Sequence, residues 1–173
     1  MDSPPALVMV DVESGQTLWE LRRFSPGERH IPVWSPDGSQ VAVLSDDGDK
    51  WEIFTVNRDG LATQWIEITM KSRIYSSLNA EGFKWSPNGR YLAFFSENLY
   101  VLDMVEHRVY DLCIPSGEWS VTIQNALTWS PDSKQVLFQR NEVPALVVDL
   151  ESNRAASLID DITMRPLGWL AAP

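Results

Sequence analysis

Acidic side chains are the most abundant candidates for chemistry in this sequence of 173 residues. Asp46, Asp47 and Asp49 stand together around Gly48 and offer the oxygen ligands that calcium prefers. The full calcium-loop pattern does not follow them, and acidic residues are common in tight turns. We therefore interpret this run as a turn and expect no metal there.

Other catalytic patterns are missing from the sequence. A serine hydrolase needs a Gly-x-Ser-x-Gly elbow served by an Asp and a His, and no such pentapeptide occurs. A zinc site needs clustered His and Cys, whereas His30, His107 and Cys113 are the only residues of these types. We expect Cys113 to be a small core residue. The sequence predicts no catalytic residue, no metal and no cofactor.

Carboxylate pairs could serve glycoside hydrolysis, but the acids of this chain follow a repeat. Four short apolar strands end in Asp11, Asn57, Asp103 and Asp149, each 46 residues after the one before. A structural residue follows a repeat, whereas a catalytic residue breaks it. We therefore expect turn residues that bond nearby backbone at Asp11, Asp37, Asp103, Asp132 and Asp149.

A second repeat runs out of phase with the first. The sequence Trp-Ser-Pro-Asp-Gly at 34–38 returns as Trp-Ser-Pro-Asn-Gly at 85–89 and as Trp-Ser-Pro-Asp-Ser at 129–133, and Trp169 follows in the matching place. Pro, Asp and Gly favour a tight turn. Internal similarity over roughly 40 to 50 residues, with several short strands in each unit, is typical of a β-propeller. We expect most of the eight tryptophans to pack between blades.

The predicted fold is all-β, a propeller of four-stranded antiparallel blades that forms a single domain or a partial propeller over residues 1–173. Complete blades are expected at about 30–69, 82–112 and 126–159. A terminal blade would combine residues 6–22 with residues 166–171 and would lack a second strand. The ring is either four-bladed or part of a larger ring that a partner chain completes, with a homodimer as one form.

Within the first complete blade, strands are expected at 31–34, 40–44, 51–56 and 63–69. The polar run 45–50 is expected to be a turn. The terminal blade would contain strands at 6–12 and 17–22 and a first strand at 167–170.

The stretches 34–48 and 85–96, together with Glu-Ile-Phe-Thr-Val-Asn-Arg-Asp-Gly at 52–60, resemble the TolB-type, WD-repeat-like propeller family over nearly the whole chain. The third copy departs at Ser133, where glycine is usual. True WD repeats also carry a Gly-His pair and a closing Trp-Asp that this chain lacks. The resemblance implies a protein-binding platform, as in TolB itself, or the substrate-gating domain of a prolyl-oligopeptidase-like enzyme.

The links between blades are the segments that do not repeat. In propellers the links from a fourth strand to the next first strand gather on one face, where binding usually occurs. Five of the 14 basic residues lie on two adjacent links of this acidic chain. Arg, Tyr and Trp are enriched at interface hot spots. We therefore expect a partner-binding site at Arg22, Arg23, Arg29, Lys71, Arg73, Tyr75, Glu118 and Trp119. The open alternative is that these residues are solvated charges and aromatics that pack over the blades.

The net charge and the apolar runs of the sequence exclude some classes of partner. A formal charge of −10 argues against nucleic acid and anionic membranes, because phosphate binding needs Lys and Arg. No basic leader followed by an apolar stretch opens the sequence, and no apolar run is long enough to cross a bilayer. We expect no membrane insertion and a cytoplasmic location.

These observations favour a non-enzymatic propeller scaffold that binds a protein or peptide partner through the links on one face. Two alternatives remain open at this stage. One is the propeller portion of a prolyl-oligopeptidase-like peptidase, and the other is a carbohydrate-active propeller.

Overall fold

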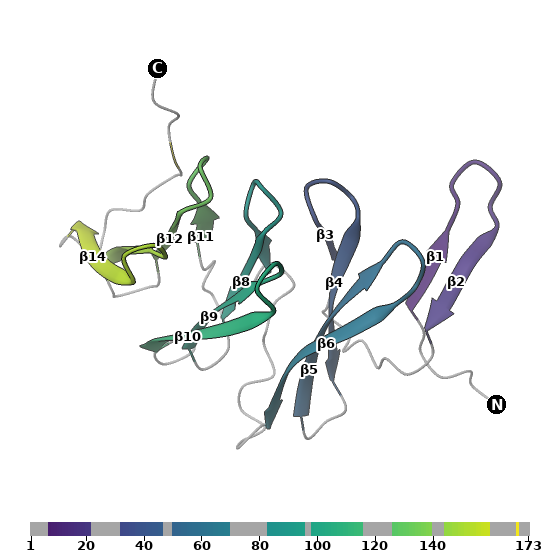
Figure 1. Cartoon of the computed structure of the whole chain (residues 1–173), viewed down its shortest axis with the longest axis horizontal. Coiled ribbons are helices and arrows are strands. Elements are labelled where there is room, and N and C mark those ends of the chain that lie inside the picture. Colours follow the sequence, from purple (N-terminus) through teal and green to yellow (C-terminus); the bar gives the residue numbers. More distant parts are fainter. Residues whose placement is uncertain are drawn as a thin grey trace. The chain divides into compact units, whose positions relative to one another are not determined.

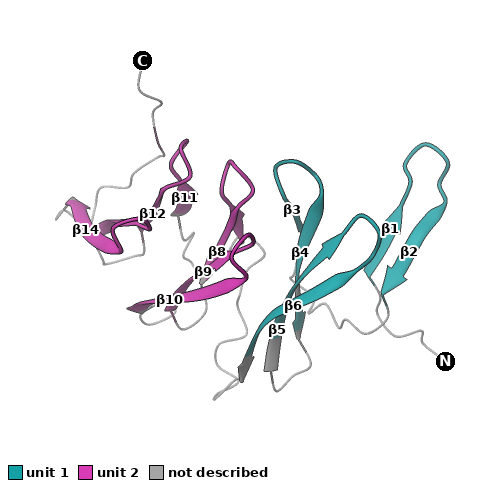
Figure 2. Ribbon diagram, in the orientation of Figure 1, with its two compact units in different colours: residues 1–80 teal, residues 81–173 magenta. Residues whose placement is uncertain are grey.

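The computed structural model describes residues 7–21, 32–46, 50–69, 83–95, 98–115, 126–139 and 144–159, together with Trp169. Within these residues the chain forms strands only, and no helix is long and apolar enough to cross a membrane. Contacts divide the chain into two compact units, residues 1–80 and residues 81–173 (Figure 2). The prediction of a single domain over 1–173 stays a prediction.

The first unit contains a two-stranded and a four-stranded antiparallel sheet (Figure 1). We call the two-stranded sheet A; it consists of β1 (Leu7–Val10) and β2 (Thr17–Leu21). Sheet B takes its strands in chain order, namely β3 (Val33–Trp34), β4 (Gln40–Asp46), β5 (Lys50–Asn57) and β6 (Ala62–Thr69).

The second unit contains two four-stranded antiparallel sheets, again with neighbours in chain order. Sheet C consists of β7 (Lys84–Trp85), β8 (Tyr91–Phe95), β9 (Asn98–Asp103) and β10 (Arg108–Pro115). Sheet D consists of β11 (Ala126–Trp129), β12 (Gln135–Gln139), β13 (Ala145–Asp149) and β14 (Arg154–Ile159). The predicted all-β architecture of four-stranded antiparallel blades is confirmed.

The three four-stranded sheets share one register, which explains the even spacing in the sequence. In each sheet the last residue of the third strand pairs with the first residue of the second strand. The pairs are Asn57 with Gln40, Asp103 with Tyr91, and Asp149 with Gln135. Since a slip of one residue would move every side chain to the opposite face, this register fixes which residues enter the core.

The second strands are buried on both faces, as their apolar sequences predict. Val41, Ala42 and Val43 are each at most 3% exposed, and Leu92, Ala93 and Phe94 are fully buried. The predicted boundary after Leu44 was too early, because Ser45 and Asp46 continue β4 and pair with Glu52 and Trp51. The predicted first strand at 167–170 lies outside the described residues except for Trp169.

Sheet A packs on sheet B through one tryptophan and a glycine turn. Leu7, Trp19 and Leu21 cover the buried cluster of Val41, Val43 and Val56. The indole N–H of Trp19 donates to the carbonyl of Arg58 at 2.9 Å. Gly60 lies directly under the ring: a Cβ added there would stand 2.9 Å from Cγ of Trp19, and the backbone has a φ of +79°.

Sheets C and D meet through a shared core and a tryptophan in β11. Trp129 stacks on Tyr91 at a centroid distance of 5.7 Å, and its indole N–H donates to the carbonyl of Lys84 at 2.8 Å. Ala93, Leu99 and Val101 of sheet C share a buried cluster with residues of sheet D that include Val136, Phe138 and Val148. Tryptophan packing between blades is therefore confirmed for Trp129.

Ser133 strengthens this contact although it departs from the repeat. It adopts a left-handed φ of 63°, close to the values of Gly38 and Gly89 at the equivalent places. Its side chain is buried, and its hydroxyl accepts a 3.1 Å hydrogen bond from the backbone N–H of Asn88. The hydroxyl thus joins the turn of sheet D to the turn of sheet C.

Replacing Gly60 by Ala tests the contact between sheets A and B. Both a left-handed alanine and displacement of the Trp19 ring oppose folding, so we expect a loss of about 2 to 4 kcal/mol in unfolding free energy. Gly15→Ala is the matched control, because Gly15 also has a positive φ but nothing within 4 Å. Urea denaturation measures both, and equal losses would contradict the contact.

Replacing Ser133 by Ala and by Gly separates its hydrogen bond from its backbone conformation. Ser133→Ala keeps the unfavourable left-handed φ and loses the bond to Asn88, so we expect a loss of about 1 kcal/mol. Ser133→Gly loses the same bond but relieves about 1 kcal/mol of backbone cost, which makes it nearly neutral. Thermal unfolding of both variants checks this order, and an alanine variant as stable as the glycine variant would refute it.

Candidate partner-binding site

The predicted site residues belong to three links between sheets. The links cover residues 22–32 between β2 and β3, 70–82 between β6 and β7, and 116–125 between β10 and β11. Each runs from the last strand of one sheet to the first strand of the next, as expected. The eight candidates lie outside the described residues and stay predictions: Arg22, Arg23, Arg29, Lys71, Arg73, Tyr75, Glu118 and Trp119.

The strand that leads into the link 116–125 carries a bulge. The pairing of β10 with β9 shifts between Asp111 and Pro115. Asp111 holds this bulge, because its carboxylate accepts hydrogen bonds from the side-chain amide of Asn98 at 2.9 and 3.0 Å and from the backbone N–H of Cys113 at 2.8 Å. Bulges disrupt a ladder locally and bend the strand, so these hydrogen bonds shape the end of β10.

Cys113 corrects a prediction, since it is exposed and not a core residue. Its backbone is left-handed, with a φ of 53°, inside the bulge. Its neighbours Leu112 and Ile114 are partly buried against the core, so the alternation of side chains along β10 places Cys113 on the opposite, exposed face.

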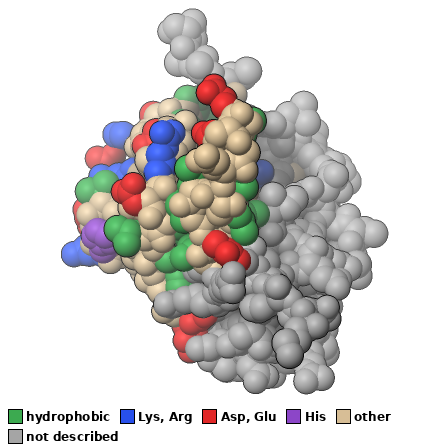
Figure 3. Space-filling view, turned by 90° about the vertical axis from the view of Figure 1, so that its right-hand side faces the viewer, with side chains coloured by type: hydrophobic (Ala, Val, Ile, Leu, Met, Phe, Trp, Pro, Cys, Tyr) green, Lys and Arg blue, Asp and Glu red, His purple; other side chains and the backbone are tan. Residues whose placement is uncertain are grey.

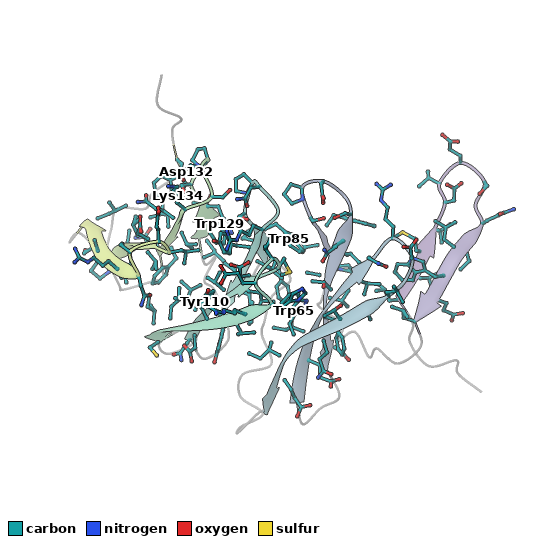
Figure 4. The ribbon with its side chains drawn as sticks, in the orientation of Figure 1. Trp65, Trp85, Tyr110, Trp129, Asp132 and Lys134 are labelled. Carbon is teal, nitrogen blue, oxygen red and sulfur yellow. The ribbon has the colours of Figure 1, made fainter. Side chains whose placement is uncertain are left out.

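The turns between first and second strands form one hydrogen-bond network, repeated three times. The hydroxyl of the motif serine donates to the carboxylate or amide oxygen two residues later, in Ser35–Asp37 at 2.6 Å, Ser86–Asn88 at 2.7 Å and Ser130–Asp132 at 2.6 Å. The same hydroxyl accepts from the backbone N–H at the start of the second strand. Figure 4 shows Asp132 and Lys134 at the turn in sheet D.

The acids in these turns are held as anions. Hydrogen bonds from the Ser35 hydroxyl and then from the Ser39 backbone lower the pKa of Asp37 to about 2. The Ser130 hydroxyl likewise lowers the pKa of Asp132. Beside it, the ammonium of Lys134 donates to Glu151 at 3.0 Å, which raises the pKa of Lys134.

The acids and the amide that end the third strands also bond the following turn. Asp11 accepts from the backbone and hydroxyl of Ser14, and Asn57 accepts from the backbone of Asp59 and Leu61. Asp149 accepts hydrogen bonds from the Gln135 side chain and from Ser152. These bonds, that from Gln135 first, lower the pKa of Asp149 to about 2. The interpretation of these repeated acids as turn residues is confirmed.

One polar cluster in sheet C breaks the repeat, and sequence reasoning missed it. Arg90 stands where the other copies have Ser39 and Lys134, and its guanidinium donates to Asp103 at 2.7 Å and to Glu106 at 3.1 Å. Arg90 also lies 4.9 Å from the ring centroid of Tyr91, the residue on which Trp129 stacks. An arginine before the second strand was the sequence signal that could have revealed this cluster.

The charged groups of this cluster pair with one another, so the cluster stabilises sheet C. Asp103 is only 1% exposed. Burial alone raises the pKa of Asp103, but the hydrogen bonds from Arg90 and from the backbone of Glu106 and Val105 outweigh it, and the pKa is lowered. The hydrogen bond with Asp103 correspondingly raises the pKa of Arg90. No group of three His, Cys, Asp or Glu side chains suited to a metal occurs within the described segments.

Four-stranded antiparallel sheets in chain order, each packed on the next within a unit, define a β-propeller. Solved structures bear this out. The chain is similar to TolB from Acinetobacter baumannii, with 16% identity, a TM-score of 0.55, and 88% of this chain matching 37% of that one.

Two further solved structures share the fold. An oligogalacturonate lyase from Vibrio parahaemolyticus matches at 14% identity and a TM-score of 0.51, over 90% of this chain and 47% of that one. A puromycin-hydrolyzing peptidase from Mycobacterium tuberculosis matches at 20% identity and a TM-score of 0.51, over 83% of this chain and 22% of that one. The chain thus spans less than half of each of these proteins, which include enzymes.

No model of a protein family matches the chain. No curated protein matches it either. The similarity is therefore one of fold.

Replacing Asp37 by Asn tests the ionised turn network. Because the pKa of Asp37 is lowered from 3.8 to about 2, its ionised form stabilises the fold above pH 3.8, and this contribution is lost as the pH falls toward 2. Asn88 fills the same role in sheet C, so Asp37→Asn should keep the acceptor and fold near neutral pH. We expect its unfolding free energy to fall less steeply than that of the wild type over this acidic range.

The control is Asp37→Ala, which removes the acceptor for Ser35 and Ser39 and should destabilise the protein at every pH. Urea denaturation followed by tryptophan fluorescence measures all three proteins. An Asn variant with the full wild-type dependence on pH would contradict the assignment.

Proposed function

We propose that this chain is a non-enzymatic propeller module that binds a protein or peptide through the links between its blades. The most direct support is that the carboxylates of the repeated acids already accept hydrogen bonds within the fold. Asp11, Asp37, Asp103, Asp132 and Asp149 each accept hydrogen bonds within their own turns or from a neighbouring side chain. These acids are therefore committed to structure, and the residues left for recognition are those outside the repeat.

The composition of the links supports the same proposal. Arg22, Arg23 and Arg29 fall on one link, and Lys71 and Arg73 on the next, in a chain whose net charge is −10. Basic groups with Tyr75 and Trp119 suit a partner that offers carboxylates and apolar side chains. The site would therefore favour an acidic peptide segment with aromatic or aliphatic anchors.

The fold by itself does not select this function, because TolB and two enzymes share it. The proposal rests on the residues of this chain. Rigid sheets that hold variable links are the usual basis of recognition in such scaffolds.

A peptide selection tests the proposal. A phage-displayed peptide library is selected against the folded chain, and the affinity of the recovered peptides is measured by fluorescence polarisation. The variant with Arg73, Tyr75 and Trp119 all changed to Ala should bind them about tenfold or more weakly, because such residues carry most of the energy of an interface.

The matched control changes Val105, Arg108 and Tyr110 to Ala. These exposed residues belong to β10 or to the turn before it, and they lie off the links. Its affinity should equal that of the wild type. Unchanged affinity in the link variant, or no recovered peptide, would refute the proposed site. Cleavage of a bound peptide would refute the non-enzymatic role.

A further inference from the structure

Sheet C has a reactive amide in its first turn, where the other two copies have a carboxylate. Asn88 is the counterpart of Asp37 and Asp132, and it is the one asparagine of the sequence that precedes a glycine, Gly89. The backbone nitrogen after an asparagine can attack the carbon of the side-chain amide. Glycine hinders this attack least, because it has no Cβ. The pair Asn88-Gly89 is therefore suited to spontaneous conversion of the amide into an acid.

This conversion needs water as its only co-reactant. The nitrogen of Gly89 bonds to Cγ of Asn88, and its proton leaves with the side-chain nitrogen as ammonia. The product is a succinimide ring. Water opens the ring at either carbonyl carbon, which gives aspartate or isoaspartate, in which the backbone continues through the former side chain. Asn88 is exposed, so water reaches it.

The folded turn holds both reacting groups away from this reaction. Oδ1 of Asn88 accepts hydrogen bonds from the Ser86 hydroxyl at 2.7 Å and from the backbone N–H of Arg90 at 3.0 Å. The N–H of Gly89 donates to the carbonyl of Ser86 at 2.9 Å. For the attack, the nitrogen must give up this bond and meet the amide carbon in the correct geometry. The turn must therefore open before the ring can form.

Sheet D holds the same turn closed from outside. The backbone N–H of Asn88 donates to the hydroxyl of Ser133 at 3.1 Å, and Ser133 lies 45 residues later in the chain. Ser133 is 2% exposed, so its hydroxyl is fixed by its surroundings. Opening of the turn in sheet C thus breaks a contact between the two sheets.

The two products should differ in their effect on the fold. In the counterpart turns a single carboxylate oxygen accepts both bonds, from Ser35 and Ser39 on Asp37 and from Ser130 and Lys134 on Asp132. An aspartate at position 88 therefore keeps the turn. Isoaspartate adds a methylene to the backbone, which a tight turn with fixed hydrogen bonds does not accommodate.

We propose that Asn88 is a site of spontaneous conversion to aspartate and isoaspartate, and that the contact of sheet C with sheet D controls its rate through Ser133. The closed turn suppresses the reaction, and release of the turn from Ser133 permits it. This site is independent of the proposed peptide binding and uses none of its residues.

Charge and mass both report the reaction. Each conversion adds one negative charge to a chain with a formal charge of −10. Figure 3 shows that acidic and basic side chains already share the surface on one side of the described part. Asp37, Asp47 and Asp59 also precede a glycine, but an acid that passes through the same ring regains its mass and charge. The change in mass therefore separates Asn88 from these acids.

The first experiment compares the folded chain with the chain in urea. Trypsin cuts after Lys84 and Arg90, so residues 85–90 form one peptide, and mass spectrometry follows its conversion over time. We expect conversion in the folded chain to be about tenfold or more slower, because the turn must open first. Equal rates in both conditions, or no conversion in urea, would overturn the proposal.

Ser133→Ala tests control by sheet D. The variant loses the bond to Asn88, so the folded protein should convert about fivefold faster than the wild type, whereas both should convert equally in urea. Gly60→Ala is the matched control, because it weakens the first unit and leaves the turn of sheet C intact. Its rate should equal that of the wild type. A rise of the same size in both variants, or none with Ser133→Ala, would refute the role of Ser133.

Asn88→Asp tests how the aspartate product fits. Because one oxygen suffices for the turn, its urea midpoint should match that of the wild type, and its peptide should gain no mass with time. Asn88→Ala lacks the acceptor and should unfold at lower urea. An Asp variant as unstable as the Ala variant would contradict the fit of the product.

Chromatography of the peptide 85–90 separates the two products, which have equal mass. In the wild-type protein kept under folding conditions, the chains that contain isoaspartate should be the more sensitive to added protease, because their turn is broken. Equal sensitivity of the two products would show that the turn accommodates the longer backbone.

Discussion

Each sheet of this protein buries its apolar faces only by packing on a neighbour, and indole-to-carbonyl hydrogen bonds fix that packing. Within the second unit, Trp129 donates to the carbonyl of Lys84 at 2.8 Å and Trp169 donates to that of Thr128 at 3.4 Å, so two tryptophans bond the residue before another tryptophan. In the first unit Trp19 makes a similar bond to Arg58 from an outer strand. An indole combines a large apolar ring with one N–H donor, so it buries surface and sets alignment at the same time.

The turns support this packing by holding the ends of the strands. The serine and the acid or amide of each first turn bond one another and the backbone, and the residue that ends each third strand does the same for the next turn. Such local bonds compete with other backbone conformations and select the tight turn. The spacing of 46 residues thus follows from the register of the strands. The acids at these positions form the hydrogen bonds that hold the turns.

The sequence predicted those features that local patterns determine. The second strands β8 and β12 lie within the blades predicted at 82–112 and 126–159, because a tight turn precedes each one and apolar residues fill it. Three features could not be read from local patterns. Exposure of Trp34 depends on which strands lie beside it, and exposure of Cys113 depends on which face of β10 meets the core. The burial of Asp103 depends on an arginine 13 residues earlier. The candidate site stays a prediction, since its residues follow no repeat and lie outside the described ranges.

Ser133 shows why a repeat can change without losing its fold. A left-handed serine is less favourable than a glycine, yet its hydroxyl bonds a backbone group of the neighbouring turn, which no glycine can do. The cost is local and the gain lies between sheets. Since the contact between blades is what the fold requires, a substitution that strengthens it can be retained at a position where the turn alone would favour glycine.

The same reasoning applies to Arg90, which replaces a small or flexible residue before a second strand. Its guanidinium donates to Asp103 and Glu106. It also lies over the ring of Tyr91, on which Trp129 stacks. The departures from the repeat at Ser133 and Arg90 therefore reinforce contacts that the fold already makes.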